Sequence, residues 1–409
     1  MTSNSRCRIC REPLPEPFLD LGRMPLANAF LRSPEEFPGE ARYPLAVCLC
    51  ECCGLVQLTL SVPAEQLYRE YPYVSSTASS VRRYASELAG KVVQALGLGS
   101  SSLVVELGSN DGLVLRAFRE RGTRVLGVEP ARNVAAVARE NGVPTVEEFF
   151  NEETAERLAS DAGPASVILG RHVFAHLDDL HGFFRGVDLL LAPEGVLLIE
   201  VPYLGNLYRD LEFDTIYHEH LSYIALRPVR FLCQAHRFGL VDVEPVPLHG
   251  GSILLWLRRS RAAKPPSARL RALLQEEERL RLGQAETWTE FAERLARWKE
   301  CFEQAVDSLS RAGARWAGYG AAAKANTLLN FCPSVANRLS AVLDRNSWKH
   351  GRYTPGTHLP VVSADRWEMN GITHLLILAW NFKEEIMAQM EPFTRAGGRF
   401  LIPIPRPEL

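Results

Sequence analysis

The stretch that decides the fold is SSLVVELGSNDGLVLRAFRERGTRVLGVEPARNVAAVARENG, residues 101–142. Its apolar runs at residues 103–107 and 125–128 suit strands that are buried on both faces, and segments with helical periodicity follow them. Between the first strand and the first helix lies ELGSNDG, residues 106–112, whose glycines let the backbone approach a ligand closely. The stretch therefore predicts a Rossmann-like α/β unit with a ligand site at this glycine turn.

The charge of the glycine turn indicates which ligand it binds. A dinucleotide would place its pyrophosphate at the helix N-terminus, where the carboxylate of Asp111 would repel it. S-adenosylmethionine fits better, because it carries an ammonium and a sulfonium group and no phosphate. Glu129, which ends the second strand, is placed to accept hydrogen bonds from both ribose hydroxyls. The alternative is an ordinary α/β turn that binds no ligand.

Three further segments continue the strand pattern: PTVEEFF, ASVILGRHVFAHL and GVLLIEVPY. Ligands of open parallel sheets bind beyond the carboxyl ends of the strands, so side chains at these ends share one rim, where Glu148 and Phe149 would border the adenine. His172 and His176 are four residues apart, but a metal site would need a third ligand. The predicted cofactor-binding residues are Glu106, Gly108, Asn110, Asp111, Glu129, Pro130, Glu148, Phe149 and His172.

The composition is that of a soluble globular protein with two or three domains: 409 residues, 46% apolar and 23% charged. The formal net charge of -2 gives no overall attraction to nucleic acid or to an anionic membrane. The first residues, MTSNSRCRIC, have no apolar core, and no apolar run approaches the roughly 20 residues that span a bilayer. We therefore expect a cytoplasmic protein whose cysteines are reduced.

Two C-x2-C pairs lie near the N-terminus, Cys7 with Cys10 and Cys50 with Cys53. Four thiolates on two such turns can complete one tetrahedron, and Gly54 allows the chain to turn back behind the second pair. The pattern predicts a closed, structural zinc site that supplies folding energy to a region short of apolar periodicity. The alternatives are free buried thiols, a redox C-x-x-C, and a zinc module for nucleic acid, which the missing basic stripe disfavours.

The stretch LEFDTIYHEHLSYI, residues 211–224, gathers carboxylates, histidines and tyrosines. Its HEH does not have the spacing of the H-E-x-x-H zinc motif, which disfavours a metal. A polar loop that caps the sheet and a set of acid/base groups around a substrate remain as alternatives. Tyr217 lies three residues before His220, so one helical turn would bring both side chains to the same side.

Eight motifs follow one another in an order that resembles the sugar C-methyltransferases of bacterial deoxysugar biosynthesis, and the match covers nearly the whole chain. The chain is most similar to the 3-C-methyltransferases that act on 4-keto-deoxysugars. The motifs are the two cysteine pairs with Gly54, YPYVSSTAS, ELGSNDG, GVEPARNVA, HVFAHL, TIYHEHLSY, HGGS and GYGAAAKANTLLN.

This resemblance implies methyl transfer from S-adenosylmethionine to the carbon beside a ketone, usually on a dTDP-linked 4-keto-6-deoxyhexose. It assigns the general base to His220, although His218 is an alternative. A neutral imidazole can remove the proton only as negative charge moves onto the carbonyl oxygen. Leu254 stands where relatives often have a basic residue, which puts a substrate contact there in doubt. The implied catalytic residues are His220, Tyr217, Glu219, His176 and Tyr73, with Tyr71 as the alternative to Tyr73.

The last third of the chain begins with two predicted amphipathic helices after a Pro-Pro boundary, and a second α/β pattern starts at residue 314. Gly318 and Gly320 precede Lys324 in a strand-to-helix turn, which is an incomplete dinucleotide fingerprint or a simple packing device. The resemblance implies that this region holds the nucleotide of the substrate, for which helix amides and a lysine suit a diphosphate. The candidate substrate-binding residues are Tyr71, Lys324, Asp344, Lys349, His358, Trp380 and Asn381.

The sequence thus predicts an α/β protein with four parts: a zinc-binding N-terminal lobe (1–70), a class I, Rossmann-like methyltransferase domain (71–258), a helical connector (259–312) and a second Rossmann-like domain (313–409). The expected reaction is methylation of carbon 3 of a dTDP-linked 4-keto-deoxysugar through an enolate. The alternatives are a C-5 methyltransferase, an oxygen or nitrogen methyltransferase, and a non-catalytic zinc-containing binding protein. The expected partner is a nucleotide sugar, with no nucleic acid or membrane, and the chain is expected to be a monomer or a weak homo-oligomer.

Overall fold

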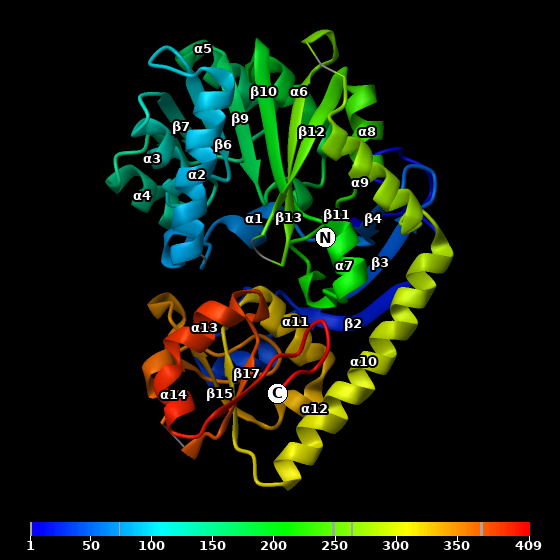
Figure 1. Cartoon of the computed structure of the whole chain (residues 1–409), viewed down its shortest axis with the longest axis vertical. Coiled ribbons are helices and arrows are strands. Elements are labelled where there is room, and N and C mark those ends of the chain that lie inside the picture. Colours follow the sequence, from blue (N-terminus) through cyan, green and yellow to red (C-terminus); the bar gives the residue numbers. More distant parts are fainter. Residues whose placement is uncertain (1, 73, 248–249, 263–264, 369–370) are drawn as a thin grey trace.

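The computed structural model describes residues 2–72, 74–247, 250–262, 265–368 and 371–409. Figure 1 shows a large α/β domain above a smaller one, with the N-terminal lobe beside both and a long helix, α10 (Ala285–Arg311), along one flank. None of the helices within the described ranges is both long enough and apolar enough to cross a bilayer. The described residues form four sheets, of seven, five, four and two strands.

The central sheet has seven strands, and its order changes direction beside β6, where the first predicted strand lies. The parallel strands continue from β6 through β7 to β8 on one side and through β9 to β10 on the other, and β13 is antiparallel to β10. A ligand crevice is expected at such a switch point. In spatial order the strands are β12 (Phe238–Val246), β13 (Ser252–Arg259), β10 (Leu191–Pro202), β9 (Ala165–Arg171), β6 (Leu103–Leu107), β7 (Arg124–Val128) and β8 (Thr145–Val146).

Helices cover both faces of the central sheet. Val104 of β6 joins a core formed with α2 and α3, whereas the neighbouring Val105 joins the core on the opposite face, which includes α5, α6 and α8. This alternation is the reason why all five residues of β6 are buried. The helices of this domain are α2 (Ser79–Leu96), α3 (Leu113–Arg119), α4 (Arg132–Glu140), α5 (Glu152–Ala162), α6 (Leu180–Leu190), α7 (Leu204–Asp210) and α8 (Leu226–Ala235).

The N-terminal lobe contains a four-stranded antiparallel sheet that incorporates one strand from far along the chain. Its edge strand β11 (Ser222–Tyr223) directly follows the HEH stretch and pairs with β4 (Leu55–Leu58). Leu58 also donates its backbone N–H to the carbonyl oxygen of Leu221. The remaining elements are β1 (Thr2–Ser3), β2 (Leu19–Pro25), β3 (Arg42–Cys50), β5 (Leu60–Ser61) and α1 (Ala64–Tyr68).

The C-terminal domain is a five-stranded parallel sheet with the order β16-β15-β14-β17-β18, the strand order of a doubly wound fold. Its strands are β14 (Trp316–Tyr319), β15 (Leu339–Asp344), β16 (Val361–Ser363), β17 (His374–Ile377) and β18 (Arg399–Leu401). Its helices are α11 (Ala323–Phe331), α12 (Pro333–Ala336), α13 (Lys383–Gln389) and α14 (Glu391–Arg395).

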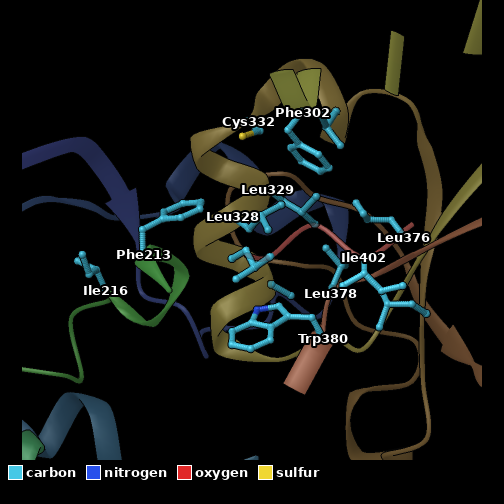
Figure 2. Packing of buried hydrophobic residues seen from close by; sticks show 14 of the residues in the cluster. Phe213, Ile216, Phe302, Leu328, Leu329, Cys332, Leu376, Leu378, Trp380 and Ile402 are labelled. Atoms are coloured by element: carbon cyan, nitrogen blue, oxygen red, sulfur yellow. The ribbon is translucent and has the colours of Figure 1, made fainter. Parts of the chain in front are cut away.

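The two predicted amphipathic helices are α9 (Ala268–Arg279) and α10, and α10 buries Trp288, Phe291 and Leu295 along one face. These side chains belong to a core that also includes residues of the N-terminal lobe and of the C-terminal domain, part of which Figure 2 shows. A shared core of this kind holds the domains together. Short 3₁₀ turns complete the fold: η1 (Pro34–Gly39), η2 (Ser75–Thr77), η3 (Phe174–His176), η4 (Phe213–Thr215), η5 (Ser260–Ala262), η6 (Ser347–Lys349), η7 (Ala364–Arg366) and η9 (Trp380–Phe382).

Candidate active site

The glycine turn after β6 has a backbone that only glycine adopts easily. Gly108 has a φ of +65°, and a Cβ added there would lie 2.3 Å from Cγ2 of Val173. Both observations exclude a larger residue without rearrangement. The turn therefore leaves room for a ligand to contact its backbone.

Unsatisfied acidic groups line this turn. Oε2 of Glu106 and Oδ1 of Asp111 are buried without a hydrogen-bond partner in the described structure. Burial raises the pKa of Glu106 to about 8, although the guanidinium of Arg171 acts in the opposite direction. A cationic ligand favours the ionised form of such a buried carboxyl group, so the unpartnered oxygen of Glu106 fits the ammonium group of S-adenosylmethionine.

Glu129 lies at the end of β7, as predicted, but part of its carboxylate is used by the protein. Oε2 accepts a 2.8 Å hydrogen bond from the N–H of Asn110, and Oε1 accepts one of 2.9 Å from the N–H of Ala131. These bonds tie the glycine turn to the next strand. Each oxygen keeps a second lone pair, so the residue can still accept from a ribose hydroxyl.

One cavity of about 740 Å³ connects the glycine turn, the HEH stretch and the start of α11. Of the predicted cofactor-binding residues, only Asp111 is absent from its lining. The predicted catalytic and substrate-binding residues that line it are His176, Tyr217, His220, Tyr71, Lys324, Lys349 and Asn381. Residues from three regions of the chain thus meet around one cavity.

His220 is held in a single orientation by two hydrogen bonds. Its Nδ1 lies 2.8 Å from the carbonyl oxygen of Thr215, which can only accept, so Nδ1 carries the proton. Nε2 is then unprotonated and accepts a 2.8 Å hydrogen bond from the hydroxyl of Tyr217. Burial lowers the pKa of His220 to about 3, which keeps the imidazole neutral.

His176 lies next to His220, with ring centroids 5.0 Å apart. Its Nε2 is buried and has no hydrogen-bond partner within the described ranges, and burial lowers its pKa well below the ordinary value. Its ring stacks on Tyr68, whose hydroxyl donates to the carbonyl oxygen of Glu219. The sequence motifs did not indicate Tyr68, because its place in the site depends on how the N-terminal lobe packs.

Glu219 faces the N-terminal lobe rather than the cavity. Both of its carboxylate oxygens accept from Nδ2 of Asn28, at 2.8 and 2.9 Å, and Oε2 also lies 3.3 Å from the hydroxyl of Tyr71. Burial raises the pKa of Glu219 to about 7. Asn28 lines the cavity but belongs to no motif, so sequence reasoning missed it.

The two histidines of HEH point to different places. Nε2 of His218 lies 3.1 Å from the carbonyl oxygen of Pro44, and its ring contacts Tyr43 edge-on. His218 therefore lies in the N-terminal lobe and does not line the cavity. Tyr73, which the resemblance assigned to catalysis, lies outside the described residues.

A buried ionic network that the motifs did not reveal supports the rim of the central sheet. Glu200 on β10 bonds to Nε and Nη2 of Arg171 at 3.0 and 3.2 Å, and its Oε1 lies 3.1 Å from Nε2 of His172. The hydroxyl of Tyr84 donates to the same carboxylate at 2.8 Å. The sequence signal for this network was the presence of two charged residues, Arg171 and Glu200, inside strands predicted to be buried.

The candidate substrate-binding residues of the C-terminal domain divide into two groups. Lys324, Lys349 and Asn381 line the cavity. Asp344 instead accepts from the N–H groups of Ala321 and of Asn346, both at 2.7 Å.

Two other candidates from this domain also lie outside the lining. Nε2 of His358 lies 3.2 Å from a carboxylate oxygen of Glu40, and its ring stacks on Phe37. Nε1 of Trp380 donates to Oδ2 of Asp214 at 2.7 Å. Both side chains therefore connect the C-terminal domain to other parts of the protein.

The four predicted metal ligands lie together, with all Sγ atoms within 4.8 Å of one another. The Sγ atoms of Cys7 and Cys53 are 3.5 Å apart, and those of Cys10 and Cys50 are 3.3 Å apart. Tetrahedral zinc with Zn–S bonds of about 2.3 Å separates its sulfurs by about 3.8 Å, so the donor set fits zinc. Hydrogen bonds with Cys50 and Cys53 hold the pKa of Cys7 well below its ordinary value, which favours a thiolate ligand.

The chain matches family models along most of its length. A model described as "Putative zinc binding domain" matches residues 7–68, one described as "Methyltransferase domain" matches residues 81–244, and one described as "C-methyltransferase C-terminal domain" matches residues 247–405. The chain is 36% identical to the C-methyltransferase NovU of Streptomyces niveus over 403 residues, which cover 98% of this chain and 96% of the relative.

Solved methyltransferase structures resemble the chain only weakly. Magnesium protoporphyrin IX methyltransferase from Synechocystis PCC 6803, with bound S-adenosylmethionine, has a TM-score of 0.33 and 12% identity, covering 43% of this chain and 79% of that one. An S-adenosylmethionine-dependent methyltransferase from Clostridium acetobutylicum ATCC 824 has a TM-score of 0.35 and 13% identity, covering 43% and 91%.

The family matches confirm the predicted fold class and the predicted cofactors. The cysteine cluster belongs to the matched zinc-binding region, and the glycine turn belongs to the matched methyltransferase domain. The alignment with the relative spans all three matched regions of this chain. The chain therefore belongs to the C-methyltransferase family, as an S-adenosylmethionine-dependent enzyme with a structural zinc site.

Proposed function

We propose that this C-methyltransferase methylates carbon 3 of a dTDP-linked 4-keto-deoxysugar, with His220 as the general base. The observation that carries the proposal is the neutral imidazole of His220, whose unprotonated Nε2 lies in the cavity that connects the glycine turn to the start of α11. A carbon becomes a nucleophile only after it loses a proton, so a base without its own positive charge is needed at this place.

His220 accepts the proton at Nε2, because Nδ1 already donates its own to Thr215. Without substrate, the hydroxyl of Tyr217 is hydrogen-bonded to Nε2. When the substrate binds, this hydroxyl would turn towards the substrate and leave Nε2 free to accept the proton. A pKa of about 3 describes the buried ring without substrate. The negative charge that develops on an enolate beside the ring raises this pKa and allows proton transfer.

His176 is suited to stabilise the enolate oxygen. Its Nε2 is buried without a partner among the described residues, so a proton on this nitrogen would be free to donate to the ligand. The neutral state of the ring, which burial favours, prevents a fixed positive charge from repelling the cofactor. S-adenosylmethionine supplies an electrophilic methyl group on a positively charged sulfur.

Lys324 supports the assignment of a substrate that carries a diphosphate. It is the second residue of α11, and its Nζ is buried without a hydrogen-bond partner in the described structure. Lys324 lowers the pKa values of Glu212 and Asp214, against the stronger effect of burial, but forms no ion pair with either. An unpaired ammonium beside helix N–H groups is suited to a phosphate group.

Incubation with a dTDP-4-keto-deoxysugar in deuterated water, without cofactor, tests the carbon-acid step. The expected result is exchange of one hydrogen beside the ketone, which NMR assigns to carbon 3. Exchange at carbon 5 would instead support the C-5 methyltransferase alternative. If the protein methylated the sugar but exchanged no hydrogen beside the ketone, the acceptor would be an oxygen or a nitrogen atom.

A matched pair of variants tests the base itself. His220→Asn is expected to lose exchange and methylation, whereas His218→Asn, which alters a histidine outside the cavity, should keep both. Full activity of His220→Asn would exclude His220 as the base. Purified wild-type protein that binds the cofactor but converts no keto sugar in a panel would support the non-catalytic alternative.

A further inference from the structure

The loop that carries the catalytic residues, 213–220, is held from outside its own domain. Strand β11 follows it and lies in the sheet of the N-terminal lobe, and its first turn, η4, packs against α11 of the C-terminal domain. Figure 2 shows Phe213 projecting from this loop towards the helix that carries Leu328 and Leu329. The position of the loop therefore depends on the C-terminal domain.

We propose that Trp380 is a positioning residue for His220, which acts through Asp214. This inference rests on the proposed role of His220. Nε1 of Trp380 donates a 2.7 Å hydrogen bond to Oδ2 of Asp214, whose side chain is completely buried. The bond joins the C-terminal domain to the residue immediately before Thr215.

Thr215 provides the link to His220. Its carbonyl oxygen is the acceptor for Nδ1 of His220, at 2.8 Å, and this bond decides which nitrogen keeps the proton. The carbonyl oxygen of the following residue, Ile216, accepts from the hydroxyl of Thr327 on α11 at 3.2 Å. The peptide that orients the imidazole is thus fixed on both sides by the C-terminal domain.

Trp380 is not positioned to contact the substrate directly. Its neighbours Ala379, Asn381 and Phe382 line the cavity, but Trp380 does not. Nζ of Lys324 lies 4.4 Å from the centre of its ring. A cation over the ring withdraws electron density and strengthens the indole N–H as a donor to Asp214.

Trp380→Phe removes the N–H and keeps most of the apolar surface. The matched control is Trp288→Phe, because Trp288 is also buried in the same core and donates its indole N–H to a carbonyl oxygen, that of Leu282, at 2.9 Å, away from the loop. The two variants should lose similar stability. A thermal melt of each checks that both are folded before they are compared.

The first readout is nitrogen NMR of histidine-labelled protein, which reports the tautomer of His220 in the resting state. Wild type and Trp288→Phe should show His220 protonated at Nδ1 only. Trp380→Phe should show a mixture of tautomers, and its kcat should fall on the order of 10- to 100-fold while the KM for S-adenosylmethionine is unchanged.

Two variants of Asp214 make the test independent of the tryptophan. Asp214→Asn keeps an acceptor oxygen for the indole and should retain the wild-type tautomer, whereas Asp214→Ala should behave like Trp380→Phe. A single Nδ1 tautomer and an unchanged kcat in both Trp380→Phe and Asp214→Ala would overturn the inference. Since the NMR readout needs no turnover, it remains decisive even if His220→Asn shows that another residue is the base.

Discussion

The hydroxyl of Tyr217 donates a 2.8 Å hydrogen bond to Nε2 of His220, the nitrogen that the bond to Thr215 leaves unprotonated. The phenol therefore covers the basic lone pair until a substrate arrives. Both residues line the cavity, so a substrate that reaches His220 also reaches Tyr217. Tyr217 and His220 together therefore determine whether the basic nitrogen is accessible to the substrate.

Tyr217→Phe should reduce methylation by a factor on the order of 10² and should slow hydrogen exchange without abolishing it, because His220 keeps its tautomer but loses the group that orients its Nε2. Steady-state kinetics and the deuterium assay measure both effects. Tyr208→Phe is the control, since its hydroxyl lies 3.4 Å from Glu290 and outside the cavity. Equal losses in the two variants would show that Tyr217 has only a packing role.

The low pKa of His220 predicts how its replacement changes acid stability. The folded pKa is about 3 and the ordinary value is 6.5, so between these values the unfolded chain binds the additional proton and stability falls as the pH decreases. His220→Asn removes this contribution. The loss of unfolding free energy between pH 7 and pH 4, measured by urea denaturation, should therefore be smaller in the variant than in wild type, and identical slopes would contradict a buried, neutral His220.

Gly108→Ala should weaken S-adenosylmethionine binding by at least roughly tenfold, because the added Cβ meets Val173 and the positive φ is unfavourable. Gly97→Ala is the matched control, since Gly97 has a similar φ of +61° and a Cβ added there would meet no atom within 4 Å. It should cost about 1 kcal/mol of stability and leave binding unchanged. Calorimetry measures the affinity for S-adenosylmethionine. If Gly108→Ala bound the cofactor as tightly as wild type, this turn would not be the cofactor site.

Zinc removal should abolish methylation although the cysteine cluster contributes no residue to the cavity lining. The zinc pair Cys50 and Cys53 directly precedes β4, and β4 holds the strand after His220. Elemental analysis should find one zinc per chain, and a chelator should lower zinc content and activity together. Cys50→Ser should lose zinc and activity in the same way, whereas Cys52→Ser, at an exposed neighbouring cysteine, should retain both. Methylation by the zinc-free protein would contradict a dependence of the active site on the zinc site.

Local patterns were sufficient for the parts of the fold that are continuous in sequence. The β6 strand, the glycine turn and the cysteine pairs depend on short-range periodicity and spacing, and the structure has strand β6 at the predicted residues 103–107. The same holds for α9 and α10, whose apolar stripes are visible in the sequence. Predicting these elements requires no information about contacts between distant residues.

Contacts between domains could not be predicted in this way. Asn28 and Tyr68 contact site residues only because the N-terminal lobe packs against the methyltransferase domain, and no motif marks them. For the same reason the sequence placed Trp380 and His358 among the substrate contacts, whereas the structure places them outside the cavity lining. Spacing alone also did not distinguish His218 from His220, whose surroundings differ completely.

The pairing of β11 with β4 has a consequence for how such enzymes can be recombined. Residues 222–223 fall within the segment matched as the methyltransferase domain, yet they form an edge of the sheet in the segment matched as zinc-binding. A chimera that exchanges the first 70 residues for those of a relative would therefore have to inherit a compatible partner strand from the other parent. The boundaries along the chain are not the boundaries at which this protein can be cut and rejoined.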